Sequence, residues 1–277
     1  MSQAKEIAII ADSSVLNTVC AGEQLDFAQY PRAAHGDTDL QAACLAADDV
    51  HSAIIIDPRP GEAEALLGRG IASVAWLIPP GPDPAHRADL ARFVAVLATD
   101  AESATAAGAE HWTLEPLPVC DRLFNGVQQP VGQVRIFFDG PTSERRDRFL
   151  QPVKHRFDVL HLVSGADVER HIGLMARCSV AIDLIKERGL TQRDRIGPAL
   201  AAGLLVLAEE PVGRPGLVAG EQLWSFNNPD QLELLISDAS REPEAFIEMR
   251  RTGREYAERL RSSVVLPRVT ELLTAAS

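Results

Sequence analysis

The chain has 277 residues, of which 46% are hydrophobic and 24% are charged, and its formal net charge is -12 at pH 7. This length and composition are typical of a globular protein with two small domains or one large one. An acidic chain repels nucleic acid and anionic membrane surfaces, so we expect neither as a partner. No apolar run approaches the roughly 18 residues that a membrane-spanning helix needs, so we expect no transmembrane segment.

The four cysteines are dispersed along the chain and form no CxxC pair. They are Cys20, Cys44, Cys120 and Cys178. Since no Cys/His cluster has the spacing of a zinc site, we expect no metal. Scattered thiols fit a reducing compartment. The first residues lead into a strand-like run without the basic and long apolar segments of a secretory signal, so we expect a cytoplasmic protein.

Short runs rich in apolar and β-branched residues recur along the chain, with helix-like segments between them. The first series is residues 7–11, 25–30, 53–56, 74–78, 93–98 and 112–114, and the second is 134–138, 159–163, 180–185, 204–208 and 223–226. Strands with apolar residues at successive positions are buried on both faces, which is typical of parallel sheets covered by helices. The sequence therefore predicts an α/β fold of two Rossmann-like parallel-sheet domains facing a cleft.

Residues 119–132 separate the two series of strands. This segment is polar, contains Gly and Pro and lacks periodicity, so it is interpreted as an interdomain linker. We expect domains at 1–128 and 129–277, with the boundary near residue 129. Helical spacing from Pro243 to residue 261, a break at residues 262–263 and a short helix at 269–275 predict that the chain returns to the first domain at its end.

Ligands of open parallel sheets bind beyond the carboxyl ends of the strands, so the loops after strands are the candidate sites. The loop after residues 7–11 contains Asp12, Ser13 and Ser14, which either cap a helix or contact a ligand. It has no GxGxxG fingerprint, and no Walker A motif occurs in the chain. The sequence therefore predicts neither an ordinary dinucleotide site nor a P-loop.

The loop after residues 134–138 has the chemistry of an anion site. Gly140 allows a ligand to approach the backbone, and a helix beginning near Ser143 would direct free N–H groups at an anion. Arg145 or Arg146 would clamp a diphosphate with forked donors. The alternative is a solvated arginine pair on the first helical turn.

The loop after residues 180–185 is rich in cations. Within ten residues it contains Lys186, Arg188, Arg193 and Arg195. We expect a phosphate or nucleotide site here, at the predicted carboxyl edge of the sheet. The alternative is a surface salt-bridge network with the nearby carboxylates of Asp183, Glu187 and Asp194.

An Ala-rich helix over residues 198–202, Gly203 as its cap and a buried strand at 204–208 predict a tight αβ unit. Glu209 and Glu210 follow this strand and are further site candidates. His161 lies within a predicted strand and is interpreted as a satisfied core residue. The first half also contains three candidate catalytic histidines, which are His35, His86 and His111. No Ser/His/Asp or HExxH signature is present.

The second half resembles the group 1 glycosyltransferases, and within them the compact bacterial branch of spore-maturation-protein-like enzymes. The motifs that carry the resemblance are Phe137 to Gly140 followed by Arg145 and Arg146, the helix 195–203 (Arg-Ile-Gly-Pro-Ala-Leu-Ala-Ala-Gly), the strand end and helix start at 226–232, and Gly253-Arg254. The resemblance covers about residues 90–265, whereas residues 1–90 share only the βα rhythm.

The resemblance implies a GT-B-like fold that transfers a sugar from a nucleotide-diphosphate donor to a glycan, lipid or protein acceptor without a metal or other cofactor. The donor would bind mainly to the second domain. The residues implied in this site are Gly140, Arg145, Arg146, Lys186, Arg193, Arg195 and Glu209.

The sequence departs from the family at two positions. Pro198 stands where the family helix carries a glutamate that hydrogen-bonds the donor ribose, and a Pro-Pro-Gly-Pro run at 79–82 stands where an acidic residue is common. An alternative is therefore a non-catalytic GT-B-like binding or scaffold subunit, with an apolar surface patch for a protein partner. A third alternative is a sugar epimerase that uses Glu209 or Glu210.

Overall fold

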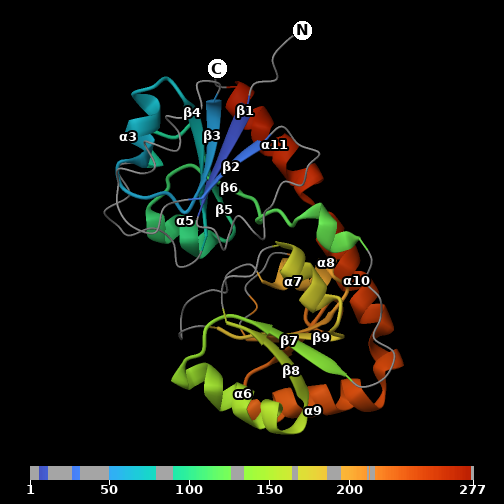
Figure 1. Cartoon of the computed structure of the whole chain (residues 1–277). Coiled ribbons are helices and arrows are strands. Elements are labelled where there is room, and N and C mark those ends of the chain that lie inside the picture. The colour runs from blue at the N-terminus through green and yellow to red at the C-terminus, as the bar shows by residue number, and fades with distance from the viewer. Residues whose placement is uncertain are drawn as a thin grey trace. The chain divides into compact units, whose positions relative to one another are not determined.

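The computed structural model describes residues 6–11, 27–31, 50–78, 90–125, 134–163, 168–185, 195–210, 212 and 216–275 (Figure 1). By its internal contacts the chain divides into two compact units, Met1–Pro118 with Ser262–Ser277 and Val119–Arg261. Each unit contains one parallel sheet. The predicted α/β class with two Rossmann-like halves is confirmed.

The sheet of the first unit has the strand order β2-β1-β3-β4-β5-β6, and every pair in it is parallel. Its strands are β1 (Glu6–Ala11), β2 (Phe27–Pro31), β3 (Val50–Ile56), β4 (Ala72–Leu77), β5 (Ala95–Ala98) and β6 (Thr113–Leu114). All six predicted strands of the first series are therefore confirmed. The strand order reverses next to β1, because β2 and β3 lie on its two sides.

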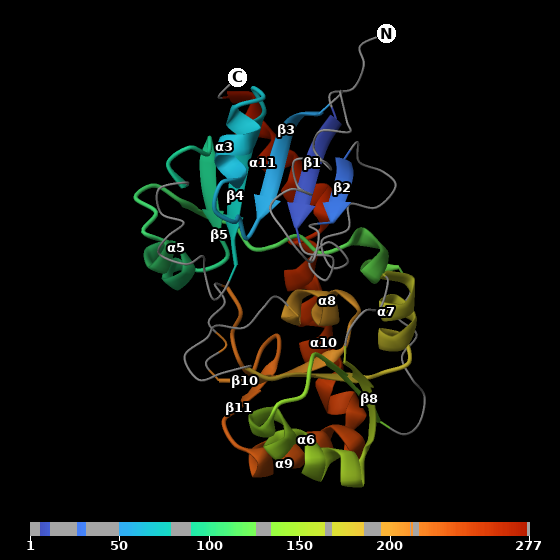
Figure 2. The ribbon, with the colours of Figure 1, turned by 60° about the vertical axis from the view of Figure 1, so that its left-hand side comes forward.

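Helices cover both faces of this sheet (Figures 1 and 2). They are α3 (Glu62–Leu67) and α5 (Ala101–Ala107) on one face and α11 (Ser262–Ala275) on the other. Leu66 of α3 packs in one core with Ile10, whereas Val269 of α11 packs in the other with Ile9 and Trp76. Alternate residues of β1 thus enter opposite cores, as the continuous apolar run predicts.

The last helix begins earlier than the sequence predicts. Ser262 and Ser263 belong to α11, and Ser262 is completely buried. Serine is common both in loops and at the start of a helix. Here the two serines begin α11 and do not interrupt a helix. The helix is also held by Arg268, whose Nη2 donates to Glu115 Oε1 at 2.6 Å.

The sheet of the second unit has the strand order β11-β10-β9-β7-β8 and is also parallel throughout. Its strands are β7 (Arg135–Asp139), β8 (Asp158–Leu162), β9 (Val180–Asp183), β10 (Leu205–Glu209) and β11 (Trp224–Phe226). These confirm the five predicted strands of the second series. The order reverses between β7 and β9.

Helices cover both faces of this sheet as well (Figure 1). They are α6 (Glu144–Arg156), α9 (Pro229–Arg241) and α10 (Ile247–Glu258), together with α7 (Val168–Met175), α8 (Ile196–Ala201) and the short 3-10 helices η2 (Asp121–Phe124) and η3 (Pro243–Phe246). Leu150 of α6 and Ile236 of α9 share a core with Phe138 of β7. The predicted αβ unit is confirmed, with Gly203 at φ +72° between α8 and β10.

The division between the units lies at Pro118/Val119 and not near residue 129. The N–H of Val119 donates to the carbonyl of Leu260 at 2.7 Å, which ties the start of the predicted linker to the end of the second unit. The Arg261 guanidinium lies 3.8 Å from the centre of the Phe124 ring. The linker interpretation, based on polarity, Gly and Pro content and missing periodicity, missed these contacts, which join residues far apart in sequence.

We expect Gly253→Ala to destabilise the second unit by about 1–3 kcal/mol, the usual cost of overpacking. A Cβ at Gly253 of α10 would lie 2.7 Å from both the Gln222 carbonyl oxygen and Leu200 Cδ2. Gly173 of α7 is the matched control, because a Cβ there meets nothing within 4 Å. Gly173→Ala should stabilise the protein by up to about 1 kcal/mol through helix propensity. Thermal unfolding of both variants checks this, and equal melting temperatures would contradict it.

Candidate functional site

The candidate site lies at the carboxyl edge of the second sheet, next to the reversal of strand order between β7 and β9. Reversal points of this kind are where open parallel sheets bind ligands, because the adjoining loops run in opposite directions. Three strands end here with acidic residues, which are Asp139 of β7, Asp183 of β9 and Glu209 of β10. The cations of the site come from α6 and from the residue before α8.

The turn after β7 is built around Gly140. This residue has φ +141°, a region that L side chains rarely adopt, and its N–H donates to the Leu162 carbonyl at 2.8 Å. The Ser143 side chain then caps α6 by accepting from the N–H of Arg146 at 3.3 Å. The predicted helix start near Ser143 is confirmed. The turn before it has backbone at Gly140 and no side chain.

Arg195 lies directly against this turn. Its Nη1 donates to the carbonyl oxygen of Asp139, and a Cβ placed on Gly140 would overlap that same Nη1. Within the part of the chain that the structure describes, the Asp139 carbonyl is the hydrogen-bond partner of this guanidinium. Glycine at position 140 is thus what allows a cation to sit on the turn.

Arg146 is the most buried cation of the site, with 4% of its surface exposed. It donates from Nη1 to the Pro141 carbonyl and from Nη2 to the Leu184 carbonyl, both at 2.9 Å. Burial lowers the pKa of this guanidinium, and the positive charge of Arg195 lowers it further. Arg146 therefore ties the loop after β7 to the loop after β9 and adds positive charge next to Gly140.

Arg145 forms a paired contact with Glu209. The two terminal guanidinium nitrogens, Nη1 and Nη2, each donate to one carboxylate oxygen of Glu209. Nη1 also donates to the Ile185 carbonyl at 2.7 Å. Glu209 is 3% exposed and in turn accepts from the N–H of Ile185 at 3.0 Å. The pair connects α6 with the ends of β9 and β10. We interpret this pair as structural. Direct contact of Arg145 or Glu209 with a bound sugar donor stays a prediction.

Other predicted candidates are not brought into this arrangement. Lys186 and Arg193 lie outside the described residues, as do Asp12 to Ser14, His35, His86 and residues 79–82. Glu210 is exposed and accepts from Ser225 Oγ at 2.6 Å. Pro198 is buried within α8, so this position offers no side-chain acceptor to a ribose.

Two histidines lie at this edge, and neither was predicted to be a site residue. His171 of α7 places Nε2 4.0 Å from Asp139 Oδ2. Burial lowers the pKa of His171, with Asp139 opposing the shift and Arg195 adding to it. His161 of β8 contacts the Gly140 carbonyl at 2.8 Å, so it is hydrogen-bonded as expected, although it is half-buried and not a core residue. The sequence signal available for both histidines was their place in β8 and α7, the next strand and helix after α6.

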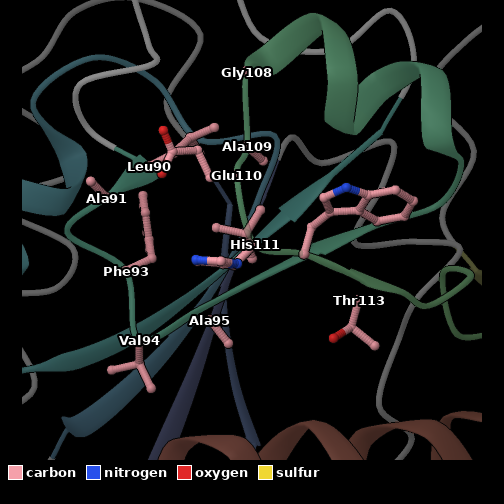
Figure 3. A pocket seen from close by; sticks show the side chains of 12 residues that line it. Leu90, Ala91, Phe93, Val94, Ala95, Gly108, Ala109, Glu110, His111 and Thr113 are labelled. Carbon is pink, nitrogen blue, oxygen red and sulfur yellow. The ribbon is translucent and has the colours of Figure 1, made fainter.

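The first unit has a hollow of about 1000 Å³ at a different place (Figure 3). It is lined by residues 90–91, 93–96 and 108–113, which precede or begin β5 and β6. The exposed side chains of Glu110 and His111 are part of this lining. The hollow is therefore at the amino ends of these parallel strands, whereas ligands of open sheets bind at the carboxyl ends.

Among the described residues, no group of three or more His, Cys, Asp or Glu side chains is arranged to hold a metal ion. In the same residues, no helix has the length and apolar character needed to cross a membrane.

No protein-family model matches the sequence, and no curated protein matches it. Solved structures do match over nearly the whole chain. Anabaena HepE in complex with UDP has a TM-score of 0.65 and 13% identity, covering 98% of this chain and 100% of that one. A glycosyltransferase from Rickettsia africae has a TM-score of 0.67 and 9% identity, covering 99% of both chains.

Sucrose-phosphate synthase from Thermosynechococcus elongatus likewise has a TM-score of 0.67 and 12% identity, covering 99% of this chain and 100% of that chain. The fold is that of the GT-B glycosyltransferases. The resemblance seen in the sequence is confirmed at the level of the GT-B fold.

Proposed function

We propose that this protein is a glycosyltransferase that holds the diphosphate of a nucleotide sugar at the carboxyl edge of the second sheet. The observation that carries the proposal is the Gly140 turn, with Arg195 lying against it at the reversal of strand order. In addition, HepE has been solved with UDP, with UDP and glucose, and with UDP-glucose. The spore-maturation-like branch remains part of the proposal.

A diphosphate fits the chemistry of this turn. The missing side chain of Gly140 leaves room for the Arg195 guanidinium on the turn, and α6, with 13 residues, begins four residues later. A helix start directs N–H groups and a positive dipole end at an anion. Arg195 donates to a neutral carbonyl in this structure, and a phosphate oxygen would replace it with a stronger charge-assisted bond.

The cations also suit the chemistry of transfer. Departure of the nucleoside diphosphate develops negative charge, which fixed positive groups stabilise in the transition state. Arg195 would contact that charge, while buried Arg146 adds a second positive charge next to the turn. Lys186 and Arg193 remain proposed contributors from the neighbouring loop. In this scheme no metal is needed, and a glycan, lipid or protein is the acceptor.

One observation favours the alternative of a non-catalytic binding subunit. Pro198 is buried in the first turns of α8, where the resembling family carries a glutamate that bonds the ribose. A nucleotide would then be held by its phosphates, and its ribose would be recognised less strongly. This alternative predicts nucleotide binding without turnover.

Calorimetric titration with UDP, GDP and ADP tests the proposal, followed by incubation with the matching nucleotide sugars. We expect one diphosphate to bind at least about tenfold more tightly than its nucleoside, because the phosphates make the charge-assisted bonds. Slow release of free sugar or transfer to an added acceptor supports the enzyme. Binding without turnover supports the binding subunit, and an epimerised sugar nucleotide supports the epimerase. No binding to any diphosphate by folded protein contradicts the proposal.

A further inference from the structure

The carbonyl of Gly140 is held by a side chain from the neighbouring strand. His161 of β8 lies beside β7, and its Nε2 is 2.8 Å from the Gly140 carbonyl oxygen. The other ring nitrogen, Nδ1, is 3.1 Å from Nζ of Lys154 on α6. The imidazole also packs on Phe138, with ring centres 5.0 Å apart. Three elements, α6, β7 and β8, therefore meet at this ring.

The two contacts fix the state of the imidazole. A lysine ammonium only donates hydrogen bonds, so Nδ1 of His161 must accept, and a carbonyl only accepts, so Nε2 must donate. This pattern requires the neutral ring with its proton on Nε2. Arg146 also lies over the Phe138 ring, with its Cζ 5.8 Å from the ring centre.

We infer that His161 is a positioning residue for the donor site, which sets the Gly140 turn through the chain Lys154–His161–Gly140. The turn carries the group that the proposed diphosphate would meet, because Arg195 Nη1 fills the space beside Gly140 and bonds the adjacent Asp139 carbonyl. Holding the Gly140 carbonyl from β8 keeps it turned away from an incoming anion, which a carbonyl oxygen would repel. The inference rests on the proposed nucleotide site.

Two substitutions separate the hydrogen bond from the packing. His161→Gln keeps an N–H donor at a similar reach. His161→Phe keeps a flat ring against Phe138 but leaves the Gly140 carbonyl without its donor. At pH 8 we expect His161→Gln to bind the diphosphate within about twofold of wild type and His161→Phe to bind it about tenfold more weakly, as for a lost hydrogen bond.

The pair of variants is a readout that simple packing would not change. Only His161→Gln restores the hydrogen bond, and only His161→Phe restores the flat ring. Unchanged binding by His161→Phe would overturn the inference, as would an equal loss of binding in both variants.

Amide exchange of the peptide spanning residues 138–145 gives a readout without nucleotide. At one fixed pH it should exchange faster in His161→Phe than in wild type, with His161→Gln close to wild type. If the wild type binds no diphosphate, the proposed function fails. If it binds but exchange and affinity are the same in all three proteins, the positioning role fails and the proposed function stands.

Discussion

Replacing Arg145 with alanine is expected to lower the free energy of unfolding of the second unit by about 3–5 kcal/mol, the usual cost of removing one partner of a buried ion pair. Glu209 is 3% exposed, and its carboxylate would lose both guanidinium donors. The Ile185 carbonyl would lose a donor as well. The ends of β9 and β10 would then be held less firmly, and calorimetry should show the second unit melting first.

Arg148 is the matched control on the same helix. Its side chain is 72% exposed and pairs with Glu144 at 2.9 Å, so Arg148→Ala should change stability by at most about 0.5 kcal/mol. The double variant Arg145→Met with Glu209→Leu removes both charges and should recover much of the loss. An Arg145→Ala variant as stable as Arg148→Ala would show that the pair does not support the strand ends.

Replacing Arg195 with alanine should weaken diphosphate binding about 10-fold to 150-fold, which corresponds to a charge-assisted hydrogen bond of about 1.5–3 kcal/mol. The guanidinium is partly exposed and bonds only one backbone carbonyl among the described residues, so folding stability should change little. Titration and a thermal melt of the same variant check both statements. A stability change with unaltered affinity would instead indicate a structural salt-bridge loop.

Gly140→Ala tests the contact between Arg195 and the turn by changing the turn. The added Cβ would overlap Arg195 Nη1 and lie 3.1 Å from Arg146 Nη1. Because Arg195 is the end of a flexible side chain, it would move away from the turn, and binding should fall as in Arg195→Ala. The positive φ adds a folding cost of about 1–3 kcal/mol. If both variants bind like wild type, the diphosphate does not contact this turn.

The sequence predicts the elements of this fold well for a physical reason. A strand covered on both faces must be apolar at successive positions, as in Ile54, Ile55 and Ile56 of β3, so each strand is a visible run. The helix that begins at Glu144 was predictable from Ser143, because a capping side chain is local information. The loop of residues 140–143 could be identified as well, because its Gly140 and its capping Ser143 are also local features of the sequence.

The partners within the site were not predictable in this way. Arg145 and Glu209 are 64 residues apart in sequence, and their pairing depends on the order β10-β9-β7, which no local pattern encodes. His161 has the sequence context of a core strand residue, and its contact with Gly140 follows only from the register of β8 on β7. The boundary at Val119 likewise reflects contacts between residues far apart in sequence, such as its hydrogen bond to Leu260.

The most direct test of the central claim is amide exchange of the wild-type protein with and without saturating UDP, GDP or ADP. A diphosphate bound at the carboxyl edge of the second sheet should slow exchange in the peptides that contain Gly140 to Arg146 and Arg195 to Gly203. Peptides from β5 and β6 should be unchanged, and they serve as the internal control. Slowed exchange confined to residues 90–113 of the first unit, or no change with any of the three nucleotides, would contradict the account.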